Sequence, residues 1–258
     1  MFKRSWHVCI GILLVGWTLG ASSQAAQIIY EQPRDPQLFE TYRVWRDGQL
    51  LEIFQATVLR RFALEKSLSL SIRNCAQPNA FYNAASREVV MCWELLSAII
   101  SAAQFRFERS TYATAATSVF SFVLYHELAH ALVNIHRTAT FGREEDNADQ
   151  IATLLFVQDD KRRSHADSNV GILAIFDFWR GGDNAYLRKH QLTGPHSPDQ
   201  QRAFNVVCWA IGSDPLSRYK HLPAMTNFPS ERIEPCVSEY RRAEAALRQL
   251  ENLSASPR

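Results

Sequence analysis

Residues 111–135 read TYATAATSVFSFVLYHELAHALVNI. The stretch contains neither glycine nor proline, and alanine, valine, phenylalanine and leucine recur throughout it. This composition over this length predicts a helix that is buried on most of its sides. The sequence His126-Glu127-Leu128-Ala129-His130 stands inside it, so two imidazoles and a carboxylate are expected in otherwise apolar surroundings.

The spacing of these three polar residues is suited to a metal ion. Four residues advance a helix by roughly 400° and about 6 Å, so His126 and His130 project from one face and can converge on one ion. Glu127 is rotated by about 100° from His126, where its carboxylate can take a proton from a water molecule. Burying such groups costs several kcal/mol unless they are paired, and a divalent ion is a natural partner. The alternative is a chance five-letter pattern on a solvated face.

A second acidic segment follows at Glu144-Glu145-Asp146-Asn147-Ala148-Asp149. Glu145 and Asp149 are four residues apart and share one face of the next expected helix. Glu145 can supply a third ligand and leave one coordination position open, while Asp149 can accept the N–H of a ligand histidine. Glu144 and Asp146 are expected to be solvated acids favoured by the helix dipole, with Glu144 as the reserve ligand.

His136 is a rival third ligand because it lies ten residues after His126, the spacing of metalloproteases with three histidines. Along an unbroken helix, ten residues rise about 15 Å and turn to a different face. His136 therefore reaches the same ion only if the helix stops after His130. Val133 stands where such families have a glycine, and its β-branched side chain disfavours a left-handed turn.

The rest of the chain predicts an α+β protein. Alternation at residues 67–72 predicts a half-buried strand, and residues 80–92 predict a β-hairpin with its turn at residues 83–86. Apolar residues at helical spacing predict a helix at residues 37–64, which Gly48 can interrupt. Ser197 or Asp199 is expected to cap a later helix that ends at Ile211. Further helices are expected at residues 93–107, 143–158, 171–179 and 236–253.

The composition is that of a folded globular protein. Of the 258 residues, 47% are hydrophobic and 21% are charged, which excludes collagen-like and mostly disordered chains. Residues 1–25 resemble an export signal, with Lys3 and Arg4 before an apolar run that is too short to span a membrane. We expect cleavage near Ala25 and a periplasmic or secreted protein without stable membrane insertion; an uncleaved anchor is the alternative. Without Lys3 and Arg4, 26 basic residues balance 26 acidic ones, so nothing indicates nucleic-acid binding.

The expected organisation after the signal is simple. Residues 26–36 contain two prolines and no periodicity, which predicts an extended leader that packs late or not at all. Residues 37–253 are expected to form the catalytic domain, as one unit or as two lobes at 37–137 and 138–253. Residues 254–258 are expected to be a frayed tail.

Four of the five cysteines remain once the segment with Cys9 is removed. An even number in an exported protein predicts two disulfides, and four cysteines allow three pairings. Cys75–Cys92 and Cys208–Cys236 are favoured because each closes a short loop. A zinc site made from these cysteines is the alternative, but the chain contains no C-x-x-C pair.

The motifs HExxH and ExxxD together resemble the gluzincin class of zinc metallopeptidases. The stretch Asn79-Ala80-Phe81-Tyr82 is similar to the edge strand of thermolysin-like enzymes, where the backbone and the asparagine hold the substrate. Between about Cys75 and Tyr240 the chain also resembles a family of exported bacterial proteins catalogued as putative metallopeptidases. A calcium-loop region is not recognisable, and only 15 residues separate His130 from Glu145.

These resemblances imply a zincin-like fold, in which a small mixed sheet packs on the HExxH helix before a mainly helical C-terminal lobe. They imply one Zn²⁺ ion held by His126, His130 and Glu145, with Glu127 as general base in the hydrolysis of a peptide or protein substrate. Asn79 and Ala80 would bind that substrate. We assign the transition-state donor to His196, which Asp199 could orient, although an ordinary histidine of a capping loop is the alternative.

Two other functions fit the same sequence. The chain could hydrolyse a non-peptide amide of the cell wall with zinc, or it could be a binding protein that zinc only stabilises. Substrate preference, oligomeric state and regulation leave no signal in the sequence.

Overall fold

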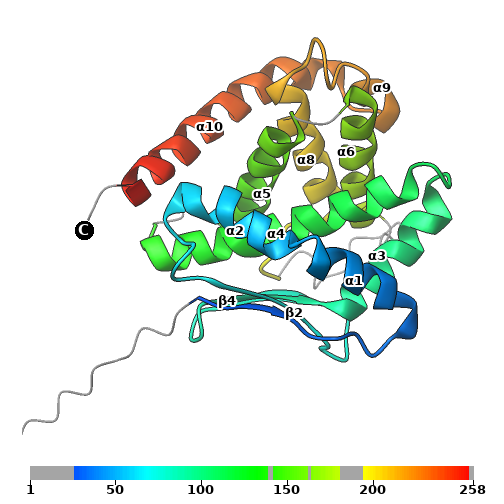
Figure 1. Cartoon of the computed structure of the whole chain (residues 1–258). Coiled ribbons are helices and arrows are strands. Elements are labelled where there is room, and N and C mark those ends of the chain that lie inside the picture. The colour runs from blue at the N-terminus through cyan, green and yellow to red at the C-terminus, as the bar shows by residue number, and fades with distance from the viewer. Residues whose placement is uncertain (1–25, 139–141, 162–163, 181–193, 256–258) are drawn as a thin grey trace, which may run out of the picture.

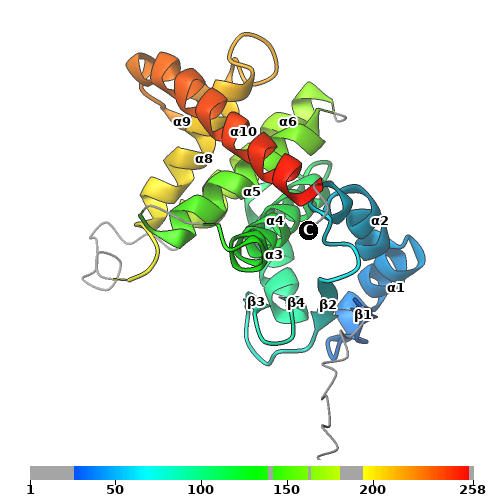
Figure 2. The same cartoon turned by 90° about the vertical axis from the view of Figure 1, so that its left-hand side faces the viewer.

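The computed structural model describes residues 26–138, 142–161, 164–180 and 194–255. A four-stranded sheet lies on one side, and the helices gather over it, with the C-terminal helices farthest from the sheet (Figures 1 and 2). Strands occupy the first part of the chain and helices dominate the rest, which confirms the α+β prediction and the small mixed sheet. The predicted export signal and Cys9 lie outside the described residues.

The sheet has the strand order β1-β2-β4-β3. Strands β1 (Ile28–Tyr30), β2 (Ser69–Arg73) and β4 (Glu88–Cys92) are parallel, whereas β3 (Ala80–Asn83) runs antiparallel to β4 as the predicted hairpin. The prediction that residues 26–36 pack late or not at all was wrong for β1. Pairing with β1 satisfies backbone groups that would otherwise remain open along the free edge of β2.

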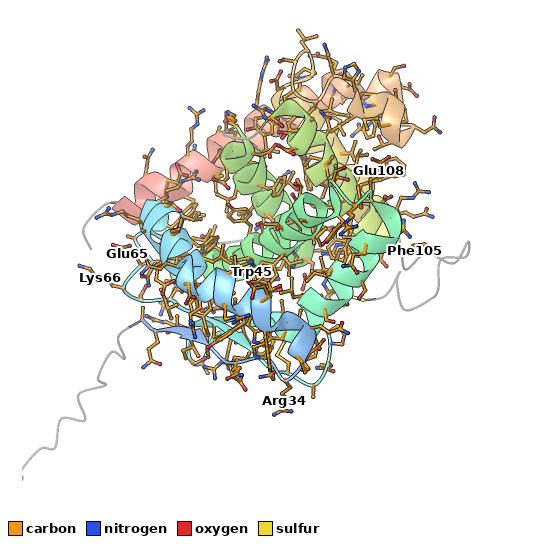
Figure 3. All side chains as sticks on the ribbon, turned by 45° about the vertical axis from the view of Figure 1, so that its right-hand side comes forward. Arg34, Trp45, Glu65, Lys66, Phe105 and Glu108 are labelled. Carbon is orange, nitrogen blue, oxygen red and sulfur yellow. A yellow bond between two sulfur atoms is a disulfide. The ribbon has the colours of Figure 1, made fainter. Side chains whose placement is uncertain are left out.

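The predicted helical face at residues 37–64 is divided among four short helices: the 3₁₀ helix η1 (Pro36–Leu38), α1 (Phe39–Asp47), α2 (Leu50–Thr57) and the 3₁₀ helix η2 (Leu59–Phe62). The break falls beside Gly48, as anticipated, but Gln49 takes the left-handed conformation with φ 55°. In Figure 3, Trp45 of α1 lies among the helices, and its ring is 4.6 Å from that of Phe120. Phe105, by contrast, stands at the edge of the molecule and is 90% exposed.

Helix α4 (Tyr112–His136) is the centre of the molecule and contains residues 112–135 of the stretch from which the fold was predicted, with Thr111 as its N-cap. It packs against α3 (Trp93–Arg106), α5 (Glu144–Asp160), α6 (His165–Arg180) and strand β3. Neighbours on several sides explain why apolar residues occur all around the helix. The helix continues past Val133 and ends where Arg137 turns left-handed, so the predicted absence of a break after His130 is confirmed.

The C-terminal region contains α8 (Asp199–Ser213), α9 (Leu222–Thr226), the 3₁₀ helix η3 (Ser230–Arg232) and α10 (Ile233–Ala255). Two expectations here were wrong. Pro198 is the N-cap residue of α8 and no side chain caps it, because the Ser197 hydroxyl bonds elsewhere. Ser254 is not frayed: it belongs to α10, and its hydroxyl donates to the carbonyl of Leu250.

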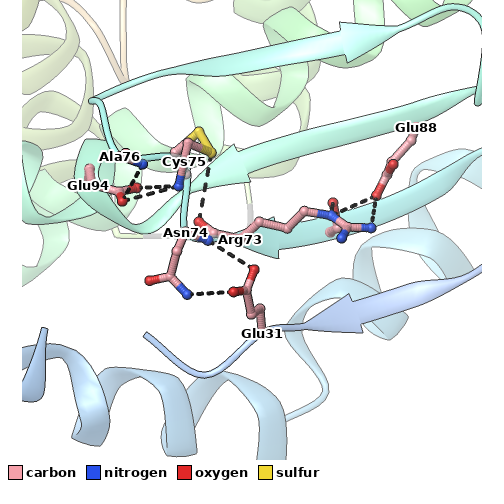
Figure 4. The surroundings of a disulfide bond; sticks show 9 residues. Glu31, Arg73, Asn74, Cys75, Ala76, Glu88 and Glu94 are labelled. Atoms are coloured by element: carbon pink, nitrogen blue, oxygen red, sulfur yellow. Dashed lines mark hydrogen bonds and ion pairs between the residues drawn. A yellow bond between two sulfur atoms is a disulfide. The ribbon is translucent and has the colours of Figure 1, made fainter. Parts of the chain in front are cut away.

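Both favoured disulfides, Cys75–Cys92 and Cys208–Cys236, are present. Cys75–Cys92 joins the segment after β2 to the end of β4 (Figure 4), and Cys208–Cys236 joins α8 to α10. Buried residues from the sheet, α4, α5, α8 and α10 form one hydrophobic core. In the part of the chain that the structure describes, no helix combines the length and apolar character needed to cross a membrane.

Candidate metal centre

Helix α4 carries His126, Glu127 and His130 into a nearly closed environment. His126 and Glu127 are only 7% and 8% exposed. The helical spacing turns both imidazoles the same way, and His126 Nε2 lies 3.2 Å from His130 Nε2. The two histidines therefore face one point, as their spacing predicted.

Glu145, in the first turn of α5, reaches that same point. Its Oε2 lies 3.1 Å from His126 Nε2 and 3.5 Å from His130 Nε2. Helices α4 and α5 pack closely, which brings the start of α5 over the middle of α4. Three ligand atoms from two consecutive helices thus form a small triangle.

Each imidazole has a carboxylate behind it. Asp149 Oδ1 lies 2.9 Å from His126 Nδ1, at the position where the sequence placed a supporting acid. Glu144 Oε1 lies 2.8 Å from His130 Nδ1, so its expected role as a purely solvated acid was wrong. In the neutral imidazoles, an N–H at each Nδ1 would donate to its carboxylate, and the lone pair of each Nε2 would then point to the centre of the triangle.

Arg202 is a supporting residue that the sequence analysis did not assign to the site. It is 4% exposed, and its Nε and Nη2 donate to the two carboxylate oxygens of Asp149 at 2.7 and 2.9 Å. Its guanidinium also lies over the Trp179 ring, 3.6 Å from the centroid. The sequence did contain a signal that Arg202 is buried, because this residue stands beside Ala203 and one turn before Val206, on the face of α8 that packs in the core.

His196 approaches from the segment before α8. Its Nε2 lies 2.9 Å from Glu145 Oε2, while its side chain remains 45% exposed. Arg143 Nη1 donates to the His196 carbonyl at 2.7 Å, and the Ser197 hydroxyl donates to Asp146 at 2.8 Å. Arg143 and Asp146 therefore both contact this segment, and the orienting role of Asp199 toward His196 stays a prediction.

Two overlapping sets of three residues could hold an ion. In one set, His126, Glu145 and His196, the ligand atoms all lie within 4.8 Å of one another. In the predicted set, His126, His130 and Glu145, the ligand atoms lie 3.1, 3.2 and 3.5 Å apart. His126 and Glu145 are common to both sets.

The electrostatics of the cluster favour positive charge. Burial lowers the pKa of His126, but hydrogen bonds to Asp149 and Glu145 outweigh it and raise the value to about 9. Burial also lowers the pKa of His130, but its hydrogen bonds to Glu145 and Glu144 outweigh burial and raise the pKa above its ordinary value. Burial would raise the pKa of Glu145, yet its contacts with the histidines hold it well below the usual range.

Glu127 differs from Glu145 because burial dominates its titration. Burial raises the pKa of Glu127 above its ordinary value, although the nearby histidines and the N–H of Tyr82 act in the opposite direction. The carboxylate therefore has a greater affinity for a proton than a solvated glutamate has. This property suits a group that must receive a proton.

A cleft of about 440 Å³ opens in front of these groups. Strand β3 forms one wall, and His126, Glu127, His130, Asn134, Glu144, Glu145 and His196 form the rest. Another cavity, of about 510 Å³, lies between α3 and α6 and has an apolar lining. Because the histidines face the smaller one, we place the site there.

Backbone pairing shows which groups of β3 face the cleft. The N–H of Cys92 donates to the carbonyl of Asn79, so Asn79 and Cys92 form a hydrogen-bonded pair of the antiparallel ladder. The next hydrogen-bonded pair, two residues on, is Phe81 with Val90. By alternation, Ala80 and Tyr82 direct their N–H and C=O groups to the outer edge. The Tyr82 N–H lies near enough to Glu127 to lower the pKa of its carboxyl group, and the Tyr82 hydroxyl donates to Asn134 at 2.9 Å.

The fold and the site together define an α+β protein with a buried histidine and carboxylate cluster that could hold a metal ion. A family described as "Putative metallopeptidase" matches residues 30–250, and the chain belongs to this family. No curated protein and no solved structure matches the chain.

Proposed function

We propose that this protein is a zinc-dependent peptidase with His126, His130 and Glu145 as metal ligands and Glu127 as general base. One observation carries the proposal. Three possible ligand atoms converge within 3.1 to 3.5 Å, and the remaining nitrogen of each imidazole already faces a carboxylate. A divalent ion at the centre would bind all three atoms at once, in exchange for the proton that His126 otherwise carries.

The donor set fits zinc in size and chemistry. Ligands at about 2.0 to 2.1 Å from a tetrahedral zinc ion are roughly 3.3 to 3.4 Å apart, close to the three separations found here. Two imidazole nitrogens and one glutamate oxygen are a common catalytic zinc set. When bound, the ion would act as a Lewis acid that lowers the pKa of water and stabilises negative charge on a carbonyl oxygen.

Glu127 is placed to move the proton. It directly follows His126 on α4, lines the cleft and has a raised pKa because it is buried. In the proposed reaction its carboxylate accepts a proton from the attacking water and passes it to the leaving amine.

His196 is proposed as the donor to the developing oxyanion and not as a fourth ligand. Four protein ligands would close the site, whereas catalytic zinc sites keep one position open. Its ring is also the most exposed of the three at the cleft, with side-chain exposures of 45% for His196, 17% for His130 and 9% for His126. Arg143 and Ser197 would hold it in place.

The substrate is proposed to bind as an extended peptide or protein segment beside β3. Ala80 would pair with it through the outward N–H and C=O, and the Asn79 side chain would add a contact. The Tyr82 N–H lies beside Glu127, so main-chain pairing with the substrate would centre on Ala80.

We further propose that the fold is zincin-like and of the gluzincin type, because the third ligand is a glutamate from the helix after HExxH. Residues 37–253 would be the catalytic domain, exported by residues 1–25 to the periplasm or the medium. The two disulfides support such a compartment.

The test compares the wild type, Glu127→Gln and a control, Glu108→Gln, which changes an exposed glutamate between α3 and α4. We expect one zinc per chain in all three and cleavage of a mixed peptide library by the wild type and the control. Turnover by Glu127→Gln should fall by about 10² to 10⁴-fold. Full turnover in that variant would remove Glu127 from its role. Turnover of cell-wall fragments without any peptide cleavage would favour the amidase alternative.

A further inference from the structure

The segment that leads into β3 must cross another strand. Strand β4 lies between β2 and β3, so residues 74–79 pass over the end of β4 to connect them. The crossing occurs at the C-terminal end of β4, because Cys92 is in register with Arg73 and Ala80 pairs with Met91. The path of this crossover determines where β3 begins.

Three anchors hold the crossover (Figure 4). The side chain and the N–H of Asn74 donate to the two carboxylate oxygens of Glu31, at 2.9 and 3.1 Å. Cys75 is bonded covalently to Cys92, at the end of the strand being crossed. The carboxylate of Glu94 accepts the N–H of Cys75 at 2.9 Å and that of Ala76 at 2.8 Å.

The Glu94 contact also stabilises an unusual backbone conformation. Ala76 has φ 62°, in the left-handed region that residues with a Cβ atom rarely adopt. Two N–H groups that converge on one carboxylate offset part of that cost. The disulfide thus acts on Cys75, five positions before Ala80, and Glu94 acts on both Cys75 and Ala76, which is four positions before Ala80.

Strand β3 is a short edge strand. It contains four residues, and within the described residues it pairs in the sheet with β4 only. It also packs on α4, where the Tyr82 hydroxyl donates to Asn134. Its far end is fixed by Asn83, whose side-chain oxygen accepts the N–H groups of Ala85 and Ser86. At its near end the carbonyl of Asn79 accepts the N–H of Cys92, the residue that the disulfide joins to the crossover. A short edge strand anchored at only one end would be mobile.

We propose that the Cys75–Cys92 disulfide and the Glu94 carboxylate are positioning groups that hold Ala80 and Asn79 in register with the metal ligands. This inference rests on the proposed function, since Ala80 and Asn79 are taken as the substrate-binding edge. Loss of either group should weaken substrate binding and leave zinc binding and the chemical step in place, because the ligands lie on α4 and α5.

The second disulfide provides a matched control. Cys208–Cys236 links α8 and α10, which pack against each other and are remote in sequence from β3. The experiment uses Cys75→Ala/Cys92→Ala and Cys208→Ala/Cys236→Ala in the whole chain. Hydrogen exchange of peptides covering residues 74–83, zinc content, kcat and KM are measured for each.

For Cys75→Ala/Cys92→Ala we expect exchange of the β3 amides to accelerate by about tenfold or more. KM should rise by about fivefold to fiftyfold while kcat stays within about twofold and zinc remains bound. The control pair should change neither exchange at residues 74–83 nor KM. Unchanged exchange in the first variant, or an equal KM increase in the control pair, would overturn the inference.

Glu94 allows the same test with the disulfide intact, in case the first variant does not fold. Glu94→Gln keeps an oxygen that can accept both N–H groups, whereas Glu94→Ala removes it. We expect faster exchange and higher KM for Glu94→Ala and near wild-type values for Glu94→Gln. Equal behaviour of the two variants would contradict the positioning role. Hydrogen exchange is measured without substrate. It therefore tests the inference even if the wild type cleaves no peptide and the proposed function fails.

Discussion

The two histidines of the candidate metal site are supported in opposite ways: we call the side of His126 the inner side and that of His130 the outer side. His126 and His130 occupy one face of α4, one turn apart, and each has a carboxylate at Nδ1. Asp149, behind His126, is 1% exposed and paired with Arg202, whereas the side chain of Glu144, behind His130, is 51% exposed. The inner histidine is therefore oriented by a buried ion pair and the outer one by a contact that water screens.

The largest effect is expected at the inner side. Asp149→Ala leaves Arg202 charged and unpaired in the core and removes the acceptor of His126 Nδ1. The free energy of unfolding should fall by about 3–5 kcal/mol, and zinc should bind about 10–100-fold more weakly. Urea unfolding of the zinc-free protein and titration against a chromophoric chelator measure the two quantities.

The double variant Asp149→Ala/Arg202→Met is the control for that loss. Methionine removes the unpaired charge and retains apolar volume, so part of the stability should return while zinc affinity stays low. A loss below about 1 kcal/mol in Asp149→Ala would show that the buried pair is not what supports the inner side.

Zinc binding should release protons because of the inner histidine. The pKa of His126 without metal is about 9, against an ordinary 6.5, since its contacts with Asp149 and Glu145 outweigh burial. His126 therefore carries a proton at pH 7 and must lose it to bind an ion. We expect release of about one proton or more per zinc at pH 7 and almost none above about pH 10.

Calorimetry in buffers of different ionisation enthalpy measures this release. Because the folded pKa is raised, the proton stabilises the metal-free protein fully below about pH 6.5, and this stability is lost as the pH rises through about 9. Asp149→Asn should reduce the release at pH 7. Zinc binding at pH 7 with no proton release would contradict the protonated state of His126.

A smaller effect is expected for the segment that carries His196. Ser197→Ala removes the hydrogen bond to Asp146 and loosens the proposed donor. We predict that kcat falls by about tenfold or less, with zinc content and KM unchanged. Steady-state kinetics with metal analysis checks this prediction; a loss of zinc would instead indicate that the segment supports a ligand.

The smallest effect is expected for Glu144→Gln. Glutamine retains an acceptor for His130 Nδ1, and an exposed contact contributes little to stability. Zinc affinity should change by about threefold or less, and the free energy of unfolding by less than about 0.5 kcal/mol. A loss as large as that of Asp149→Ala would remove the distinction between the two sides.

The elements that carry the ligands could be predicted because their signals are local. Helix α4 combines length, apolar composition and HExxH in one uninterrupted segment, and Glu145 and Asp149 share one face of α5. The hairpin of β3 and β4 follows from alternation and turn residues in sequence. Each of these patterns depends on residues within a few turns of one another.

The supporting parts depend on contacts between distant segments. Arg202 lies 53 positions from Asp149, and β1 pairs with a strand some 40 residues later. Glu144 appeared to be a solvated acid until the packing of α5 on α4 placed it at His130. Propensity and spacing give no information about such pairings, because tertiary contacts determine them.

The continuous core constrains how the cleft receives its substrate. The sheet that carries β3, the helix beneath the cleft and the helix with Glu145 all pack into the same apolar interior. Walls joined in this way do not swing apart about a hinge. If the proposed function holds, we therefore expect a substrate to bind along β3 as an extended segment that is already unfolded. Unstructured tails and unfolded chains should then be cleaved faster than compact domains.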